Sequence, residues 1–243
     1  MTKNRATVVT ELLGTTEQHL HFLDERVAIH KDMLPAFQAL SIAAQKAGIH
    51  LKIASGFRSF ERQLLIWNNK FSGQSTIKDN QGNIIDKSSL SDDELMHAML
   101  LFSALPGASR HHWGCDIDVY ASNLLADDYQ LQLEPWEYSE QGPLSKLSIW
   151  LNKYAHQFGF YFPYATYQGG VAAEPWHLSY APLAQHYQKG FNKINLEEVL
   201  LTNEISGKKI ILNNLDNIIE RYITNVNDIP KNCNIRGLHN SVK

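Results

Sequence analysis

SRHHWGCDID, residues 109–118, places two histidines and two aspartates within ten positions of this chain of 243 residues. The alternation that follows the glycine predicts a strand over residues 115–120. Side chains two positions apart on a strand point to the same face, so Asp116 and Asp118 share one face. Either carboxylate is therefore placed to bind a metal together with His111, and spacing alone does not choose between them.

A second group with the same chemistry, EPWH, occupies residues 174–177. On a regular strand Glu174 and His177 would point to opposite faces, so we predict an irregular backbone at Pro175 that brings both to one site. Catalytic zinc takes three protein ligands and leaves a fourth position for water. A nearby carboxylate outside the ligand set then accepts the proton of that water. His111, one aspartate and His177 supply a candidate ligand set, and Glu174 is the candidate base.

A third segment, SGFRSFERQ at residues 55–63, contains an arginine and a glutamine next to a glycine-bearing turn. Together the three segments resemble the zinc D-Ala-D-Ala peptidases of bacterial cell-wall metabolism. That family includes vancomycin-resistance carboxypeptidases and dipeptidases, LD-carboxypeptidases and some phage endolysins. The resemblance covers roughly residues 55–180.

The family motifs match this chain in register. The signature Ser-x-His-x-x-Gly-x-x-x-Asp is matched by Ser109, His111, Gly114 and Asp118. The later Glu-x-x-His is matched by Glu174 and His177, and the upstream Ser-Gly-Tyr/Phe-Arg-Ser with a later Gln is matched by residues 55–59 and Gln63.

The resemblance implies one catalytic Zn²⁺ ion held by His111, Asp118 and His177, with Glu174 as the catalytic base. It selects Asp118, and not Asp116, as the oxygen ligand. The family usually has a small residue at the position of Asp116, so this chain carries an extra carboxylate near the site.

The same resemblance gives Arg58 a catalytic and substrate-binding role. A guanidinium suits a developing oxyanion or the C-terminal carboxylate of a peptide. Ser109 and Gln63 are expected to help by hydrogen bonding to the substrate. Asp116 is expected either to hold a ligand histidine or to bind a substrate amine.

Composition excludes several other classes of function. With 44% hydrophobic and 19% charged residues the chain is an ordinary globular protein. The net charge of −3 gives no reason to expect a nucleic-acid partner. No run approaches the ~18 apolar residues of a membrane span, and two cysteines do not make a disulfide scaffold. The oligomeric state is left open.

The start of the chain bears on location. Residues 1–13 lack the apolar run of a signal peptide. We therefore expect a cytoplasmic protein if Met1 is the native start, and a periplasmic one if a leader was trimmed.

Apolar periodicity predicts helices separated by short strands. The expected helices span residues 32–47, 59–71, 91–103, 143–158, 182–190, 196–203 and 208–222, and the expected strands lie near residues 51–55, 115–120 and 173–180. Ser59 is expected to cap one helix, and Ser91 with Glu94 should form a capping box. This pattern predicts an α+β fold, with a small, mainly antiparallel sheet that holds the metal site. We expect an N-terminal segment (1–30), a catalytic core (31–180) and a helical C-terminal extension (181–243) packed on the core.

The resemblance implies an enzyme that releases C-terminal D-alanine from peptidoglycan stem peptides or muropeptide fragments. A cytoplasmic enzyme acting on D-Ala-D-Ala would attack precursors that the cell needs, so LD-carboxypeptidase activity on tetrapeptides is favoured over DD-carboxypeptidase activity. Two alternatives stay open. One is an endopeptidase that cuts cross-links in an open-ended groove, and the other is a non-catalytic protein that binds cell-wall peptides.

Overall fold

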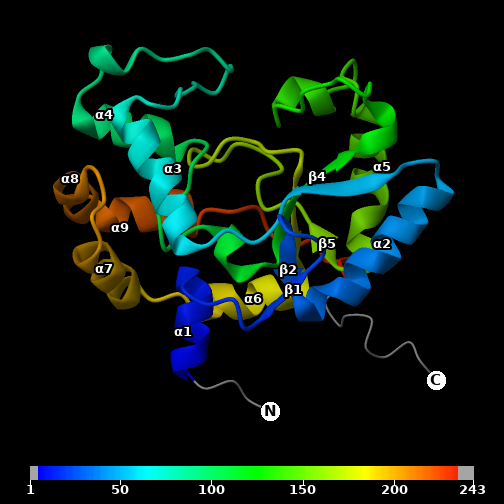
Figure 1. The fold of residues 1–243 in the computed structure, drawn as a ribbon, viewed down its shortest axis with the longest axis horizontal. Coiled ribbons are helices and arrows are strands. Elements are labelled where there is room, and N and C mark those ends of the chain that lie inside the picture. The colour runs from blue at the N-terminus through cyan, green and yellow to red at the C-terminus, as the bar shows by residue number, and fades with distance from the viewer. Residues whose placement is uncertain (1–4, 235–243) are drawn as a thin grey trace.

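The computed structural model describes residues 5–234, which form helices around a small antiparallel sheet (Figure 1). The sheet has four strands in the order β3-β4-β6-β5, and a separate hairpin pairs β1 with β2. The strands are β1 (Leu20–Phe22), β2 (Ala28–His30), β3 (Leu51–Ser55), β4 (Asp116–Ala121), β5 (Phe160–Tyr161) and β6 (His177–Tyr180). The predicted α+β class with a small antiparallel sheet is confirmed.

Nine α-helices and several shorter helical turns are found in the described residues. The α-helices are α1 (Arg5–Leu13), α2 (Leu34–Lys46), α3 (Phe60–Ser72), α4 (Asp92–Leu100), α5 (Ser145–Tyr154), α6 (Ala181–Gly190), α7 (Lys193–Thr202), α8 (Lys208–Asn213) and α9 (Leu215–Ile218). The 3₁₀ turns are η1 (Lys31–Met33), η2 (Lys87–Ser89), η3 (Arg110–Trp113), η4 (Ser122–Leu124), η5 (Pro135–Tyr138) and η6 (Ala155–Phe158). A π-helical turn, η7 (Ile219–Ile223), follows α9.

Both predicted helix starts are confirmed. The Ser59 hydroxyl accepts a hydrogen bond from the Arg62 amide at the start of α3. Ser91 and Glu94 form a full capping box, in which each side chain accepts from the backbone amide of the other residue. These contacts satisfy amides that have no partner inside the helix, and they fix where α3 and α4 begin.

Two predicted elements differ from the structure. The strand expected over residues 173–180 begins only at His177, because a turn at Pro175 precedes it. The last helix, expected over residues 208–222, is divided into α8, α9 and η7. Asn214 makes the break: its backbone leaves the helical region, and its side chain bonds to the carbonyl of Ile210 and to the carboxylate of Asp93.

Two hydrophobic clusters make up the core. The first packs the sheet against α2, α5 and α6, and the second packs α3 and α4 against α7, α8 and α9. Figure 1 shows α2 and α5 on one side of the sheet and α3, α4 and the C-terminal helices on the other. Trp67 of α3 is fully buried in the second cluster, and its indole donates to the carbonyl of Ser206. The C-terminal helices thus pack directly on α3. The first four and last nine residues of the expected terminal segments lie outside the described residues.

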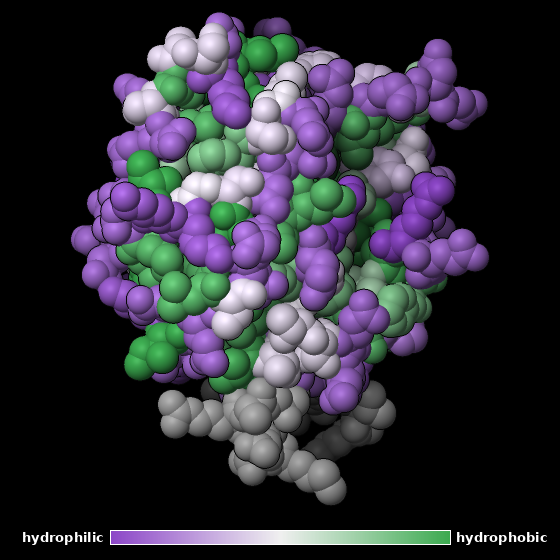
Figure 2. All heavy atoms as spheres, turned by 60° about the vertical axis from the view of Figure 1, so that its left-hand side comes forward, coloured by the Kyte–Doolittle hydropathy of each residue, from purple (hydrophilic) through white to green (hydrophobic). Residues whose placement is uncertain are grey.

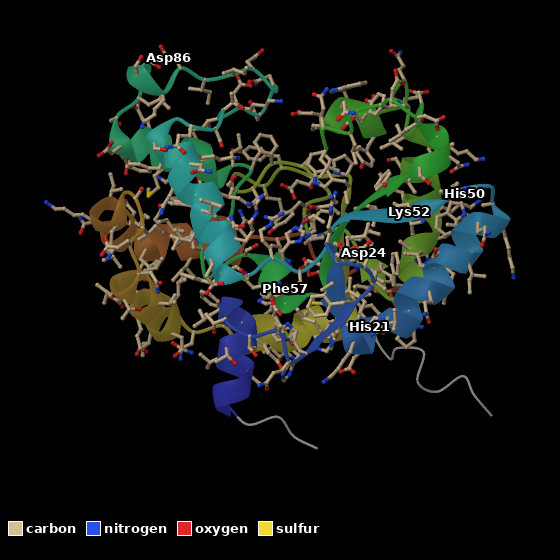
Figure 3. All side chains as sticks on the ribbon, in the orientation of Figure 1. His21, Asp24, His50, Lys52, Phe57 and Asp86 are labelled. Carbon is tan, nitrogen blue, oxygen red and sulfur yellow. The ribbon has the colours of Figure 1, made fainter. Side chains whose placement is uncertain are left out.

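Helix length and surface polarity both bear on a possible membrane span. On the face shown in Figure 2, hydrophobic side chains are interspersed with hydrophilic ones. Within residues 5–234 every helix is too short or too polar to cross a membrane. The polar segment that connects α3 to α4 carries Asp86. In Figure 3 this residue lies far from His50 and Lys52 at the beginning of β3.

Candidate active site

Strand pairing brings two of the predicted metal ligands together. Asp118 on β4 lies directly opposite His177 on β6, so both side chains face the same side of the sheet. His111 comes from η3, which ends at Gly114 in the left-handed conformation (φ 67°). A Cβ at Gly114 would lie 3.0 Å from the His30 backbone nitrogen, so this turn requires glycine.

The three ligand candidates form a compact donor set. One nitrogen or oxygen atom from each of His111, Asp118 and His177 lies within 4.8 Å of the others, and all three residues are buried. His111 Nε2 lies 3.4 Å from one Asp118 oxygen, and His177 Nδ1 lies 3.4 Å from the other. This is a nitrogen, oxygen, nitrogen set of the kind that zinc prefers.

Each ligand histidine is oriented by a hydrogen bond on its outer ring nitrogen. His111 Nδ1 lies 2.8 Å from the carbonyl oxygen of Gly56, which can only accept, so this nitrogen carries the proton. His177 Nε2 lies 2.9 Å from a carboxylate oxygen of Asp116. The opposite nitrogens, Nε2 of His111 and Nδ1 of His177, therefore face the metal position, as in metal sites generally.

One observation tests whether these residues fit a metal. Asp118 Oδ1 is buried and accepts no hydrogen bond from the described residues. Buried carboxylate oxygens normally have partners, and a cation between the two histidines would supply one. Burial also lowers the pKa of His111 to about 4, which leaves its ring neutral and able to bind a metal at neutral pH. The donor set thus fits a zinc ion.

Glu174 reaches the same point from an irregular segment, and the bend predicted at Pro175 is confirmed. Residues 175–176 form a turn in which the His177 amide donates to the Glu174 carbonyl over 3.1 Å. Glu174 Oε2 consequently lies 3.2 Å from His177 Nδ1. Burial raises the pKa of the Glu174 carboxyl. A raised pKa suits a group that takes up a proton and releases it again.

Arg58 is held at the site by two neighbours. Its guanidinium donates to Gln63 Oε1 over 3.0 Å and to Ser55 Oγ over 3.1 Å. Gln63 is fully buried, and its amide donates to the carbonyl of Ala104. The cavity wall includes Arg58 and Ser109 but not Gln63. The sequence analysis expected Gln63 to bond to the substrate. In the structure Gln63 lies behind Arg58 and does not line the cavity.

Asp116 is also placed differently from one of its two predicted roles. Its carboxylate is fully buried and does not line the cavity. Its oxygens accept from His177 Nε2, from Ser179 Oγ over 2.8 Å and from Arg110 Nε over 2.6 Å. Contact with a substrate amine does not fit this position, whereas holding a ligand histidine does.

The sequence analysis gave Arg110 no role, yet this residue organises the region behind the metal. Its guanidinium donates to Asp116, to Ser179 Oγ over 2.7 Å and to the Tyr161 hydroxyl over 3.1 Å. It also lies 4.6 Å from the ring centre of Trp113. Burial opposes ionisation of Asp116, but Arg110 and His177 outweigh it and hold its pKa at about 2. The sequence held one sign of this role, because Arg110 and Asp116 carry opposite charges within one motif.

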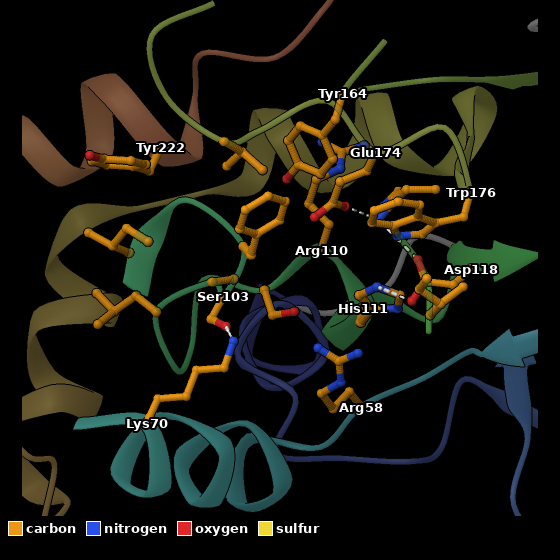
Figure 4. A pocket seen from close by; sticks show the side chains of 18 of the residues that line it. Arg58, Lys70, Ser103, Arg110, His111, Asp118, Tyr164, Glu174, Trp176 and Tyr222 are labelled. Carbon is orange, nitrogen blue, oxygen red and sulfur yellow. Dashed lines mark hydrogen bonds and ion pairs between the residues drawn. The ribbon is translucent and has the colours of Figure 1, made fainter. Parts of the chain in front are cut away.

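A cavity of about 420 Å³ opens onto these groups (Figure 4). The metal-binding residues, Glu174 and Arg58 line it, as do Ser109 and Tyr164. The wall also includes Ser103 and, from α3, Lys70. Tyr222 and Ile223 of η7 form a further part of it. One cavity therefore contains a metal-binding cluster, a buried carboxylate and a guanidinium.

The model of the VanY D-alanyl-D-alanine carboxypeptidase family matches residues 26–183 of this chain. The chain belongs to this family. It is therefore a zinc metallopeptidase, and the described residues contain a buried His/Asp/His cluster that fits such a metal.

Several individual proteins are similar to parts of this chain. An uncharacterized protein of Haemophilus influenzae is 36% identical over 121 residues, which cover 49% of this chain and 92% of that protein. A D-alanyl-D-alanine carboxypeptidase of Enterococcus faecalis is 26% identical over 183 residues, covering 74% of this chain but 58% of that protein. Among solved structures, VanYB in complex with D-alanine-D-alanine is 26% identical, covers 76% of this chain and 89% of that chain, and gives a TM-score of 0.48.

Residues beyond the family match hold one loop of the enzyme's active site. The loop from Pro163 to Gly170 carries Tyr164 and precedes Glu174, and Glu174 N donates to the Tyr164 carbonyl over 2.9 Å. Residues 221–227 form five hydrogen bonds with this loop. The bonds are Asn227 N to Pro163 O (2.8 Å), Thr166 N to Asn227 Oδ1 (3.2 Å), Asn227 Nδ2 to Thr166 Oγ1 (3.0 Å), Asn225 Nδ2 to Gln168 O (2.9 Å) and Arg221 Nε to Gly169 O (2.5 Å).

Gly170→Ala is expected to disturb this contact. A Cβ at Gly170 would lie 1.9 Å from the Arg221 carbonyl oxygen, so the loop and η7 must move apart. We expect a loss of about 1–3 kcal/mol in the free energy of unfolding, together with a lower kcat/KM, measured by urea denaturation and peptide hydrolysis. Gly169→Ala is the comparison, because its Cβ meets nothing within 4 Å and adds only backbone strain. Equal stability of Gly170→Ala and the wild type would contradict this packing.

Proposed function

We propose that this enzyme is a zinc-dependent carboxypeptidase that releases C-terminal D-alanine from peptidoglycan-derived peptides. The observation that carries the proposal is the meeting of His111, Asp118, His177 and Glu174 in one cavity with Arg58. Family membership supports the reaction class. Because the chain spans little more than half of the Enterococcus carboxypeptidase, the substrate is argued from this site.

His111, Asp118 and His177 would hold the metal, and Glu174 lies beside their donor atoms. Zinc, when bound, polarises the scissile carbonyl and makes a water molecule more acidic. Glu174 accepts a proton from that water as the new carbon–oxygen bond forms. When the carbon–nitrogen bond breaks, Glu174 returns the proton to the departing amine. The same carboxylate thus acts first as a base and then as an acid.

Arg58 supplies positive charge at the place where negative charge develops. Gln63 and Ser55 fix its guanidinium, so little reorganisation is needed when the carbonyl oxygen becomes an oxyanion. Ser109 lines the same wall and offers a hydroxyl to the C-terminal carboxylate of the peptide. Gln63 acts through Arg58, and Asp116 acts through His177.

Two features favour removal of a single terminal residue over endopeptidase cleavage. Tyr222 and Ile223 complete the cavity wall from the C-terminal helices. The loop that carries Tyr164 is hydrogen-bonded to η7 and to the segment that follows it, which supports a site bounded on that side. An endopeptidase needs space for peptide on both sides of the scissile bond.

The finer choice between LD- and DD-carboxypeptidase activity is decided by two substrates. We favour the LD activity and expect the zinc-loaded protein to release one D-alanine from a stem tetrapeptide, measured by mass spectrometry. A pentapeptide ending in D-Ala-D-Ala should be cut more slowly. Cleavage of the pentapeptide alone would reject the LD assignment, and cleavage of neither peptide would favour a non-catalytic binding protein.

A further inference from the structure

Lys70 is a half-buried lysine on the cavity wall whose charge has no carboxylate partner within the described part of the chain. It lies in the last turns of α3, and its ammonium donates to Ser103 Oγ over 2.5 Å (Figure 4). Ser103 is 6% exposed and also lines the cavity. An ammonium group has three donors, so two donors of Lys70 remain for another acceptor.

The helix fixes where this ammonium lies relative to the reaction centre. Gln63, Trp67 and Lys70 are spaced by four and three residues, so they share one face of α3. Gln63 holds Arg58, and Lys70 follows seven residues later, about 10 Å further along the helix axis. Arg58 therefore marks the part of the wall beside the metal site, and Lys70 marks a part further away.

Of the three other cations along this wall, Arg58 is held by Gln63 and Ser55 beside the metal site, and the remaining two have carboxylate partners. Lys78 forms an ion pair with Glu134, and Arg110 is paired with Asp116. Lys70 donates to a hydroxyl instead, and the charges that act on it from further away are those of Arg58, Glu174 and Lys78. Burial and Arg58 lower the pKa of Lys70 more than the carboxylate of Glu174 raises it, and an anion bound at the ammonium would offset the remaining effect.

We propose that Lys70 and Ser103 form a subsite for a carboxylate of the peptide substrate. The proposal rests on the peptidase function proposed above and names a chemical feature of its substrate. Two carboxylates have this chemistry: the C-terminal carboxylate, and a carboxylate carried by an internal residue of the stem peptide. A peptide without the relevant carboxylate leaves the ammonium uncompensated, so the subsite selects acidic peptides.

A purely structural role for Lys70 makes a different prediction. A lysine in the last turn of a helix interacts favourably with the helix dipole, and its loss would lower stability without changing substrate preference. The test therefore needs a reading of KM and kcat on matched peptides as well as a melting temperature.

The experiment compares Lys70→Met with the wild type on two pairs of peptides. In one pair the C-terminus is free or amidated, and in the other an internal diamino acid carries its second carboxylate or is replaced by lysine. On the peptide that bears the bound carboxylate we expect KM to rise about tenfold, with kcat nearly unchanged. On its partner without that carboxylate KM should not change, and the affected pair identifies which carboxylate is bound.

Three controls keep the outcomes separate. Lys46→Met removes an exposed lysine at the end of α2 and should change nothing, whereas Lys70→Arg keeps the charge and should restore most of the affinity. If an amidated peptide is not hydrolysed at all, calorimetric binding to the inactive Glu174→Ala variant replaces KM. An equal effect of Lys70→Met on every peptide, or no effect, overturns the subsite. Absence of hydrolysis by the wild type would instead contradict the proposed function.

Discussion

Glu174→Ala is expected to lower kcat by about 10³-fold or more while the protein still folds and binds zinc. The loss follows because the substituted side chain can neither accept the proton of the water nor return it to the leaving amine. Positioned proton transfer contributes about 10²–10⁴-fold in enzymes generally. The ligand set does not include Glu174, so zinc binding should persist.

The measurement is D-alanine release, combined with zinc stoichiometry and a melting temperature. Glu174→Gln is the matched control, because it keeps the shape and a hydrogen-bonding oxygen but cannot be a base. We expect it to be nearly as inactive as Glu174→Ala. Activity that survives in either variant would mean that another group removes the proton.

Asp116→Ala is expected to weaken both the fold and the metal site. It leaves the guanidinium of Arg110 buried without its carboxylate partner, and breaking a buried pair in this way costs about 3–5 kcal/mol. It also removes the acceptor that orients His177. Loss of such a supporting partner lowers metal affinity about 10–100-fold. Urea denaturation and zinc titration measure the two effects.

Two further variants separate these causes. Asp118→Ala removes the predicted ligand and should abolish zinc binding, but it leaves Arg110 paired with Asp116. In the double variant Arg110→Met with Asp116→Ala, no charge is left buried and unpaired, so part of the stability should return while zinc affinity stays low. Asp116→Ala with wild-type zinc affinity would contradict the role given to Asp116.

Much of the site was predictable because its residues lie in short motifs. Asp116 and Asp118 are two residues apart, so both were expected on one face of the strand. Glu174 and His177 are three apart, so they could meet only through the bend that is found at Pro175. The choice between the two aspartates needed the family resemblance. The structure then gave each a distinct position, with Asp118 among the metal-facing atoms and Asp116 behind His177.

The parts that were not predicted depend on contacts between distant segments. Arg110 is surrounded by Tyr161 and Ser179, which lie 51 and 69 residues later in the chain. No local pattern reports such a neighbourhood. The break between α8 and α9 likewise falls at Asn214, whose side chain meets Asp93 of α4. Periodicity shows which face of a helix is apolar, but it does not show where tertiary contacts interrupt the helix.

The position of zinc itself tests the central claim most directly. Anomalous X-ray diffraction at the zinc absorption edge, on crystals of the zinc-loaded protein, locates the ion independently of activity. We predict one strong peak about 2.0–2.2 Å from His111 Nε2, His177 Nδ1 and a carboxylate oxygen of Asp118. A peak bound to other residues, or no peak at this cluster in the presence of excess zinc, would contradict the account.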